Sequence, residues 1–199
     1  MAKVNYVLID YENVQPKDMS QLLGGSFKVC VFVGAMQTKL SFDTAHVIQQ
    51  LGHNAEYVKI EGSGQNALDF HIAYYVGKLA GENPEAYFHI VSKDTGFDPL
   101  TRFLRARKIR CERRPTLLDI PLIAMANITT SDERLGAIIE NLKKRGSARP
   151  KKPETLAATI NSLFGNKLAV ADVNGLLDQL KAKKIIKEAG GKITYSFSN

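Results

Sequence analysis

Residues Tyr87–Leu104 read YFHIVSKDTGFDPLTRFL. The first part of this stretch, through Val91, is a short apolar run typical of a strand that is covered on both faces. Beyond it, Asp94 and Asp98 lie beside apolar residues that recur at helical spacing. Two carboxylates therefore occur where a predicted strand passes into a helix, which is where open α/β sheets place their ligands.

Strand and helix patterns alternate on both sides of this stretch. The predicted strands cover residues 4–10, 27–33, 55–60, 87–91 and 109–113, and the predicted helices cover 16–23, 41–51, 66–79, 99–107 and 117–126. Right-handed crossovers place such helices on both faces of a sheet, so the pattern predicts an α/β fold with a doubly wound, parallel, five-stranded sheet. In the common strand order 3-2-1-4-5, the first and fourth strands are neighbours. In the helix over 41–51, we expect Phe42, Ala45, Ile48 and Leu51 to face the core.

Composition limits the class of protein. At 199 residues with 44% hydrophobic residues, the chain suits one domain plus a small module. No apolar run approaches the roughly 20 residues of a membrane span, and the N-terminus lacks the long apolar core of a secretory signal. The only cysteines, Cys30 and Cys111, fall in predicted strands, so we expect reduced core thiols. A soluble, cytoplasmic protein without membrane contact is predicted.

The formal charge of +7 is unevenly distributed. Residues 128–199 hold 13 Lys+Arg against 7 Asp+Glu, whereas the earlier residues hold 14 against 13. One basic segment in the earlier part is opposed only by Glu112, and its members are Arg102, Arg105, Arg107, Lys108, Arg110, Arg113 and Arg114. A basic module beside an acidic centre suits a polyanionic ligand, although an ordinary solvated surface is the alternative for charge alone.

Acidic side chains follow several of the predicted strands. Asp10 ends the first strand, and Asp69 lies near the start of the helix that follows the third. With Asp94 and Asp98, they can meet at one sheet edge. Each also has a local explanation: Asp10 can form an Asx turn with Asn13, and the other three can cap helices. Capping explains each acid singly but not their common location.

Carboxylates gathered without basic partners repel one another, which raises their pKa values unless a cation neutralises them. Mg²⁺ or Mn²⁺ usually neutralises such a cluster, since both ions bind oxygen ligands and can stabilise the oxygens of a phosphodiester. Zinc is disfavoured because Cys and His do not occur at ligand spacing. A dinucleotide-binding fold lacks its Gly-x-Gly-x-x-Gly motif after the first strand.

Three motifs resemble those of the PIN-like nucleases, particularly the NYN branch. They are Asp10-x-x-Asn13, Asn66-x-x-Asp69 and the segment from Ser92 to Leu100, within residues 4–127. The resemblance implies a Mg²⁺- or Mn²⁺-dependent ribonuclease. It carries metal-site roles to Asp10, Asp69 and Asp94 and hydrogen-bonding roles to Asn13 and Ser92.

One departure from the family pattern concerns the third motif. Many NYN members have a second Asp where this chain has Gly96, and Asp98 follows instead. Asp98 either replaces that acid or leaves a second metal weakly bound. The predicted catalytic set is therefore Asp10, Asn13, Asp69, Asp94 and Asp98, of which the four aspartates are the predicted metal ligands. Substrate contacts are expected from Ser92, Thr95, Arg105, Lys181, Lys183, Lys184 and Lys192.

The C-terminal part reads as a separate module. Helices are predicted from Ser131, over 155–164 and over 170–181, followed by two strands that turn at Gly190-Gly191. Residues 146–153 are either a flexible link or an extended loop. The pattern is similar to a LOTUS-type winged helix-turn-helix. The predicted domains are a nuclease domain over 1–128 and a nucleic-acid-binding winged helix over 129–199.

Two functions remain open. The first is a metal-dependent nuclease acting on nucleic acid, with single-stranded RNA the favoured substrate. The second is an inactive PIN-like domain that serves as a binding or assembly module. The presence of Asp10, Asp69 and Asp94 favours the first. The oligomeric state, including a homo-oligomer, is left open.

Overall fold

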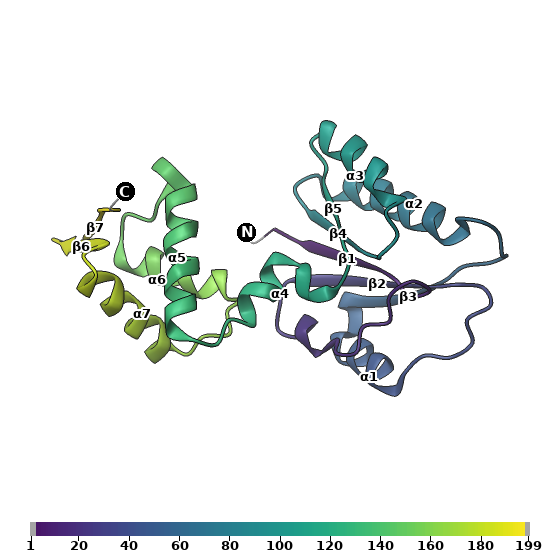
Figure 1. The fold of residues 1–199 in the computed structure, drawn as a ribbon, viewed down its shortest axis with the longest axis horizontal. Helices are drawn as coiled ribbons and strands as arrows, with labels where there is room; N and C mark the ends of the chain where they lie inside the picture. The colour runs from purple at the N-terminus through teal and green to yellow at the C-terminus, as the bar shows by residue number, and fades with distance from the viewer. Residues whose placement is uncertain (1–2, 198–199) are drawn as a thin grey trace. The chain divides into compact units, whose positions relative to one another are not determined.

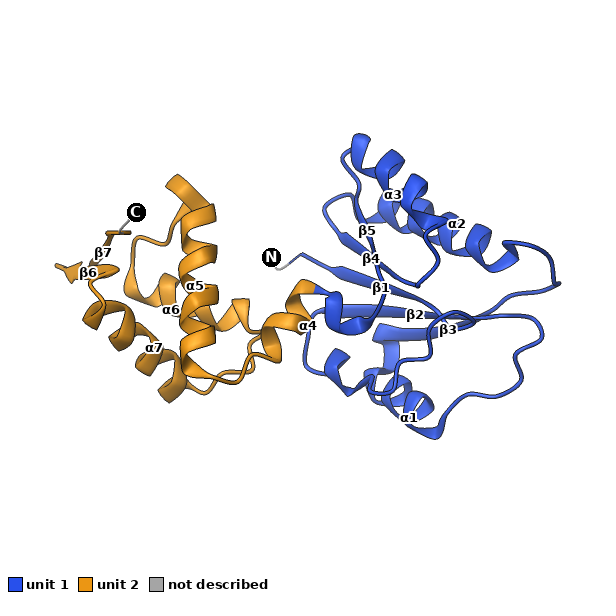
Figure 2. Ribbon diagram, in the orientation of Figure 1, with its two compact units in different colours: residues 1–120 blue, residues 121–199 orange. Residues whose placement is uncertain are grey.

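The computed structural model describes residues 3–197. The chain forms two compact units, residues 1–120 and 121–199 (Figure 2). Each unit has a hydrophobic core of its own.

The N-terminal unit is built on a five-stranded parallel sheet (Figure 1). Its strands are β1 (Asn5–Asp10), β2 (Phe27–Val33), β3 (Ala55–Lys59), β4 (Tyr87–Val91) and β5 (Arg110–Arg114). Their order is β3-β2-β1-β4-β5, so the predicted topology is confirmed. Every residue of the central strand β1 is buried, which explains its nearly continuous apolar run.

Helices cover both faces of this sheet. The helices α2 (Ala67–Glu82) and α3 (Phe97–Ala106) lie on one face, and α1 (Phe42–Leu51) lies on the other (Figure 1). The core under α2 and α3 includes Leu8, Phe32, Ile72 and Phe88, all almost fully buried. This arrangement follows from right-handed crossovers, because the direction of winding reverses between β3 and β4.

The buried face of α1 differs from the predicted one. The helix begins at Ser41, whose side chain accepts a hydrogen bond from the Thr44 amide. Thr44, Val47 and Ile48 are the buried residues of this helix. Phe42 is 81% exposed and Ala45 is also exposed, so the expectation that these two face the core is wrong, whereas Leu51 is partly buried. The helix is rotated because Val47, rather than Phe42, shares a face with Ile48 and Thr44.

The helix predicted over 16–23 is also wrong. Only the short 3-10 helix η1 (Ser20–Leu22) forms there. The Asp18 carboxylate accepts hydrogen bonds from the Ser20 amide at 2.8 Å and from the Ser20 hydroxyl. Such local side-chain bonding competes with a regular helix. Met19 and Leu22 are buried, which anchors the segment without one.

The single helix predicted over 117–126 is divided in two. The 3-10 helix η3 (Leu117–Asp119) is closed by a capping box between Thr116 and Asp119. The next helix, α4 (Pro121–Ala126), begins at a proline, which cannot donate a backbone hydrogen bond to the preceding turn. Along the chain, the first compact unit ends at Ile120, between η3 and α4, whereas the sequence predicted a domain boundary after residue 128.

The C-terminal unit contains the predicted three helices and strand pair. After α4 come α5 (Ser131–Arg145), α6 (Pro153–Leu163), α7 (Val170–Ala182), β6 (Ile186–Ala189) and β7 (Lys192–Tyr195). The strands are antiparallel, and Gly190 and Gly191, both with positive φ, form their turn. The amphipathic helices share a core that includes Leu135, Ile138, Leu156, Leu176 and Leu180.

The segment between α5 and α6 is an anchored loop, not a free link. It opens with the 3-10 helix η4 (Gly146–Ala148). The Ile193 amide donates to the Lys151 carbonyl at 2.9 Å, and the Tyr195 hydroxyl donates to the Pro150 carbonyl at 2.6 Å. The loop is thereby held beside β7.

Candidate active site

The carboxyl ends of β1 and β4 bring the first and third motifs together. Asp10 is the last residue of β1, and Ser92 follows the last residue of β4. The two strands pair in parallel, with Ile9 opposite Val91. Asp10 is only 3% exposed, and Asp94 lies two residues beyond the buried Ser92. Two predicted site carboxylates are thus placed at one edge by strand pairing alone.

A short chain of hydrogen bonds orients Asp10. The Ser92 hydroxyl donates to Asp10 Oδ2 at 2.8 Å, and the Asn13 backbone amide donates to Asp10 Oδ1 at 3.1 Å. The Asp94 amide in turn donates to Ser92 Oγ at 3.0 Å. The Asx turn considered for Asp10 and Asn13 therefore exists, and it fixes the carboxylate.

The same geometry bears on the two roles predicted for Ser92, a hydrogen-bonding group and a substrate contact. Ser92 is completely buried, and its hydroxyl is engaged with Asp10 and the Asp94 amide. A group in that position holds Asp10 in place, which favours the hydrogen-bonding role. Thr95, the neighbouring predicted contact, is exposed.

Asp94 is fixed by its own loop. Its Oδ1 atom accepts a hydrogen bond from the Gly96 amide at 2.7 Å. A Cβ atom added to Gly96 would lie 3.0 Å from that oxygen, which is a tight contact. The glycine that departs from the family pattern thus allows a close approach of backbone to carboxylate.

Asp69 lies in the first turn of α2, near the carboxyl end of the sheet. The residue before the helix, Asn66, has a left-handed conformation with φ of 60° and makes no side-chain cap hydrogen bond. A reciprocal cap between Asn66 and Asp69 is therefore absent. The Asp69 carboxylate is therefore not engaged in a reciprocal cap with Asn66.

Glu12 is a carboxylate that the sequence did not single out. Glu12 is exposed and lies two residues beyond the buried end of β1, and its side chain lies over Gly34 just past β2. A Cβ atom at Gly34 would lie 1.5 Å from Glu12 Oε1, so a larger residue there would force the Glu12 side chain to turn away from this position. The clue available from the sequence was the glycine directly after an apolar strand.

The charges of these carboxylates are uncompensated. Burial, followed by the charges of Asp10, Asp94 and Glu12, raises the pKa of Asp69. Burial is also the main cause that raises the pKa of Asp10, with Asp94 adding to it and the Ser92 and Asn13 hydrogen bonds opposing it. Within residues 3–197, none of these acids forms an ion pair. We call Asp10, Glu12, Asp69 and Asp94 the acidic centre.

The chemistry of the acidic centre fits a hard divalent cation, because oxygen donors without a basic partner are its usual ligands. In the described part of the chain, however, no three acidic, His or Cys side chains gather closely enough to form a ready metal-ligand set.

Asp98 is not brought into the acidic centre. Its carboxylate faces Arg113 of β5, with Arg113 Nε 2.7 Å from Oδ1 and Nη2 3.3 Å from Oδ2. The hydrogen bonds from Arg113 hold the pKa of Asp98 below its usual value. Both carboxylate oxygens are thus engaged by a guanidinium, which is the opposite of the surroundings expected for a metal ligand.

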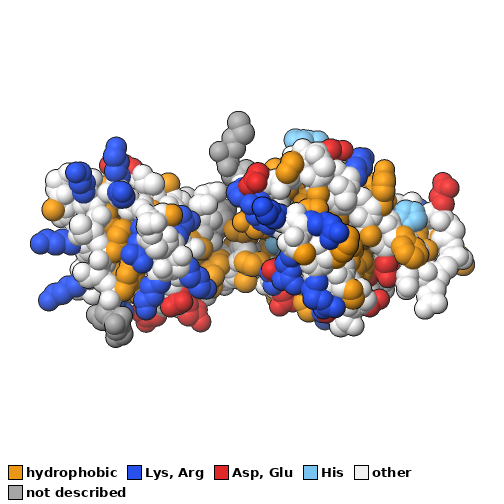
Figure 3. Space-filling model, turned by 90° about the horizontal axis from the view of Figure 1, so that it is seen from above, with side chains coloured by type: hydrophobic (Ala, Val, Ile, Leu, Met, Phe, Trp, Pro, Cys, Tyr) orange, Lys and Arg blue, Asp and Glu red, His pale blue; other side chains and the backbone are white. Residues whose placement is uncertain are grey.

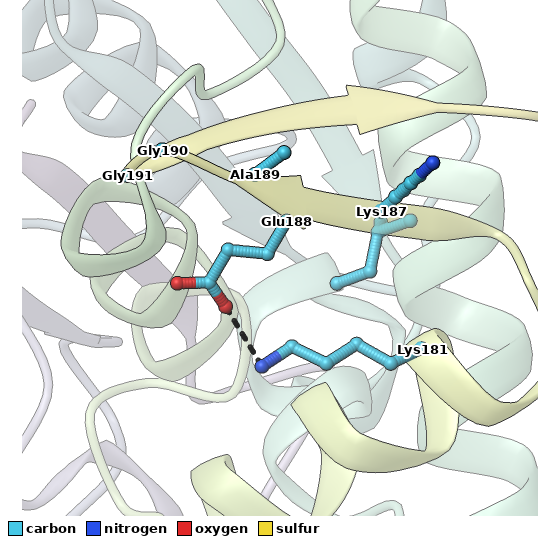
Figure 4. A pocket seen from close by; sticks show the side chains of 7 residues that line it. Lys181, Lys187, Glu188, Ala189, Gly190 and Gly191 are labelled. Carbon is cyan, nitrogen blue, oxygen red and sulfur yellow. Dashed lines mark ion pairs between the residues drawn. The ribbon is translucent and has the colours of Figure 1, made fainter.

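The predicted basic contacts fall into two groups. Arg105 is exposed on α3, 3.9 Å from Glu112. In the C-terminal unit, Lys181 forms an ion pair with Glu188 at 2.8 Å across an open pocket of about 500 Å³ (Figure 4). Lys183, Lys184 and Lys192 are exposed. Lys192 also lines a pocket of about 300 Å³ with Arg149 and Lys151, two residues that the sequence analysis had not singled out.

Comparison with known proteins identifies the class of protein to which this fold and its acidic centre belong. Residues 4–114, more than half of the chain, match the family model of the PIN domain. The chain therefore belongs to the PIN domain family, whose members are generally nucleases. Neither the curated proteins nor the solved structures include a significant match. None of the described helices is long and apolar enough to cross a membrane.

Proposed function

We propose that this protein is a divalent-metal-dependent nuclease that hydrolyses phosphodiester bonds of single-stranded RNA. The observation that carries the proposal is the acidic centre of a PIN domain, where carboxylates without ion pairs surround the carboxyl end of the central strand. Burial and mutual repulsion disfavour their ionised forms, so a bound cation would relieve an unfavourable interaction.

Asp10, Asp69 and Asp94 would hold Mg²⁺ or Mn²⁺, with Glu12 as a further carboxylate of the same region. When bound, such an ion supplies a lowered pKa for its water and stabilises charge on phosphoryl oxygens. Asp98 is proposed for a different role, because Arg113 engages both of its oxygens.

Hydrogen bonds within the chain orient the carboxylates of the acidic centre. Ser92 and the Asn13 amide hold the Asp10 carboxylate in a single orientation. The Gly96 amide does the same for Asp94. The exposed Lys93 and Thr95 lie on the loop that carries Asp94, where they can contact the phosphate backbone of a strand. These residues would bind and orient the strand, and the carboxylates would bind the cation.

Three further assignments belong to this proposal. The NYN branch rests on the three sequence motifs. A LOTUS-like winged helix rests on the three helices and hairpin of residues 121–199, which we propose as an aid to nucleic-acid binding. A cytoplasmic location remains a prediction from the sequence. The alternative function is an inactive binding module. The observation that favours it is that residues 3–197 contain no group of three side chains ready to bind a metal.

The deciding experiment incubates the full chain with a fluorescent single-stranded RNA in Mn²⁺, in Mg²⁺ and in EDTA. Metal-dependent cleavage supports the proposal, and the same DNA sequence tests the sugar preference. Cleavage that persists undiminished in EDTA contradicts metal dependence. Tight binding without cleavage in any metal assigns the inactive alternative.

A further inference from the structure

A second charged region lies at the edge of the sheet, along α3 and β5. A pocket of about 320 Å³ opens there, lined by Asp98, Thr101, Arg102, Arg105, Glu112 and Arg113. We call it the arginine pocket. Lys and Arg side chains gather over the part of the N-terminal unit that carries α3 (Figure 3). The pocket is polar, open to solvent and separate from the acidic centre.

The arginine pocket has excess positive charge. Arg113 is neutralised by Asp98, whereas Arg102 forms no ion pair within residues 3–197. Arg105 is 3.9 Å from Glu112, whose carboxylate also meets Arg114. Arg102 and Arg105 are exposed and three residues apart on α3, so they project from one face of the helix.

Arg102, Arg105 and Arg113 all line this one pocket. The charges of Arg102 and Arg105 add to the hydrogen bonds of Arg113 in lowering the pKa of Asp98. All three therefore lie near one carboxylate. Asp98 pairs with Arg113, and the two acids of the pocket, Asp98 and Glu112, carry less charge than its three arginines.

The pocket is tied to the acidic centre through the backbone. Arg113 Nη1 donates to the Ser92 carbonyl at 3.2 Å, while the Ser92 hydroxyl donates to Asp10. Arg113 is largely buried, with 16% of its side chain exposed, and it lies between the arginine pocket and the acidic centre. A strand bound at the acidic centre would have its next phosphates close to Arg113.

We propose that the arginine pocket binds a backbone phosphate of the nucleic-acid strand, with Arg102 and Arg105 as the direct contacts. Asp98 is a positioning residue, which holds Arg113 and the pocket wall. A guanidinium offers a planar fork of donors that matches phosphate oxygens, and phosphate contacts fix the register of a strand. The inference rests on the proposed function for the identity of its ligand.

Binding without catalysis tests it. Full-length wild type and the R102Q/R105Q variant are titrated with a fluorescent ten-nucleotide oligouridylate in EDTA, and anisotropy gives Kd at several salt concentrations. The matched control is R107Q/K108Q, which removes the same charge from the end of α3, where Arg107 stacks on Phe103. We expect Kd to rise about 10-fold at low salt for R102Q/R105Q. The salt slope should fall by about 0.7, as one lost phosphate contact predicts.

The control variant should change Kd by less than about two-fold at the same salt. Equal weakening in both variants would overturn a defined site in favour of a general positive field. Undetectable oligouridylate binding, or equally strong competition by polyglutamate of the same charge, would also overturn the phosphate assignment. Cleavage is measured separately, so specific binding by an inactive protein would refute only the proposed nuclease.

A second variant tests the role of Asp98. D98N should raise Kd for oligouridylate a few-fold and leave the Mn²⁺-induced rise in melting temperature unchanged. The conservative D98E variant, which keeps the charge opposite Arg113, should restore binding. Loss of the Mn²⁺ effect in D98N would instead place Asp98 among the metal ligands.

Discussion

The acidic centre and the arginine pocket use the same residue type under opposite conditions. Asp69 and Asp10 have raised pKa values because they are buried and face other carboxylates. Asp98, a few residues from Asp94 along the chain, has a lowered pKa because Arg113 donates to it. One region therefore has an excess of negative charge and the other an excess of positive charge, although they are adjacent along the sheet edge.

This contrast shows that the partner of a carboxylate decides its chemistry. An aspartate without a cationic partner is a potential metal ligand, whereas one held by a guanidinium is a structural or positioning group. Adjacent regions of opposite charge also suit a polyanionic substrate. The arginine pocket can bind phosphates directly, whereas the acidic centre can bind them only through a cation.

The largest expected effect comes from Asp94→Asn, which removes one charge from the acidic centre but keeps the oxygen that accepts from Gly96. RNA cleavage in Mn²⁺ should fall by more than about 100-fold, since loss of a ligand exceeds the effect of its supporting groups. Gel-based cleavage rates measure this. Glu82→Gln, at the far end of α2, is the control and should cleave like wild type; similar rates in all three proteins would refute the acidic centre.

Glu12 extends the comparison to a residue outside the sequence motifs. Gly34→Ala should displace the Glu12 side chain, because the new Cβ would lie 1.5 Å from its Oε1 atom. If Glu12 belongs to the acidic centre, Glu12→Gln and Gly34→Ala should both weaken Mn²⁺ affinity by about 10-fold. Calorimetric titration checks this, with Glu61→Gln as the control. Unchanged affinity in Glu12→Gln would exclude Glu12 from the site.

The pH dependence of stability should differ in sign between the two regions. The raised pKa of Asp69 gives stability that is present at low pH and lost as pH rises through that pKa. Metal-free Asp69→Asn should therefore be more stable than wild type at neutral pH, by less than about 1 kcal/mol, and the gain should vanish in acid.

Asp98→Asn should show the opposite sign. The lowered pKa of Asp98 gives stability that is present above the ordinary aspartate pKa and lost as pH falls through the lowered one. Melting temperatures from pH 3 to 8 test both variants. His89, whose pKa burial lowers to about 4, destabilises all three proteins below pH 6.5 and so cancels in the differences. Equal signs for the two variants would contradict the contrast.

The smallest effect concerns the C-terminal unit. Lys183, Lys184 and Lys192 are exposed without ion pairs in the described residues, whereas Lys181 is paired with Glu188. Replacing the first three by Gln should raise KM for long RNA about two- to four-fold and spare short RNA, because the module adds affinity outside the chemistry. Lys181→Gln should change KM less. An unchanged KM in the triple variant at low salt would assign this face to another role.

Local chemistry made much of this molecule predictable. The apolar runs of β1, β2 and β4 marked buried parallel strands, and the alternation with helices predicted the strand order. Since parallel strands share one carboxyl edge, Asp10 and Asp94 could be placed together before any coordinates. The turn at Gly190-Gly191 was equally local.

Predictions that depended on particular side-chain contacts were less successful. The helix over 16–23 was wrong because the Asp18 side chain bonds the backbone of Ser20, and the inward face of α1 was wrong because the core selects Val47 over Phe42. For Ser92, the structure shows a buried hydroxyl that donates to Asp10, a contact across two strands that the sequence did not indicate.

The sequence by itself determined the alternation of elements, the sheet order and the edge at which acids collect, because hydrophobic periodicity and turn residues act over a few positions. Only the tertiary structure decided which of those acids are free of cations. Arg113 lies fifteen residues from Asp98 and meets it across β5, and Glu12 is placed by the space above Gly34. Charge pairing depends on distances through space, which spacing along the chain does not encode.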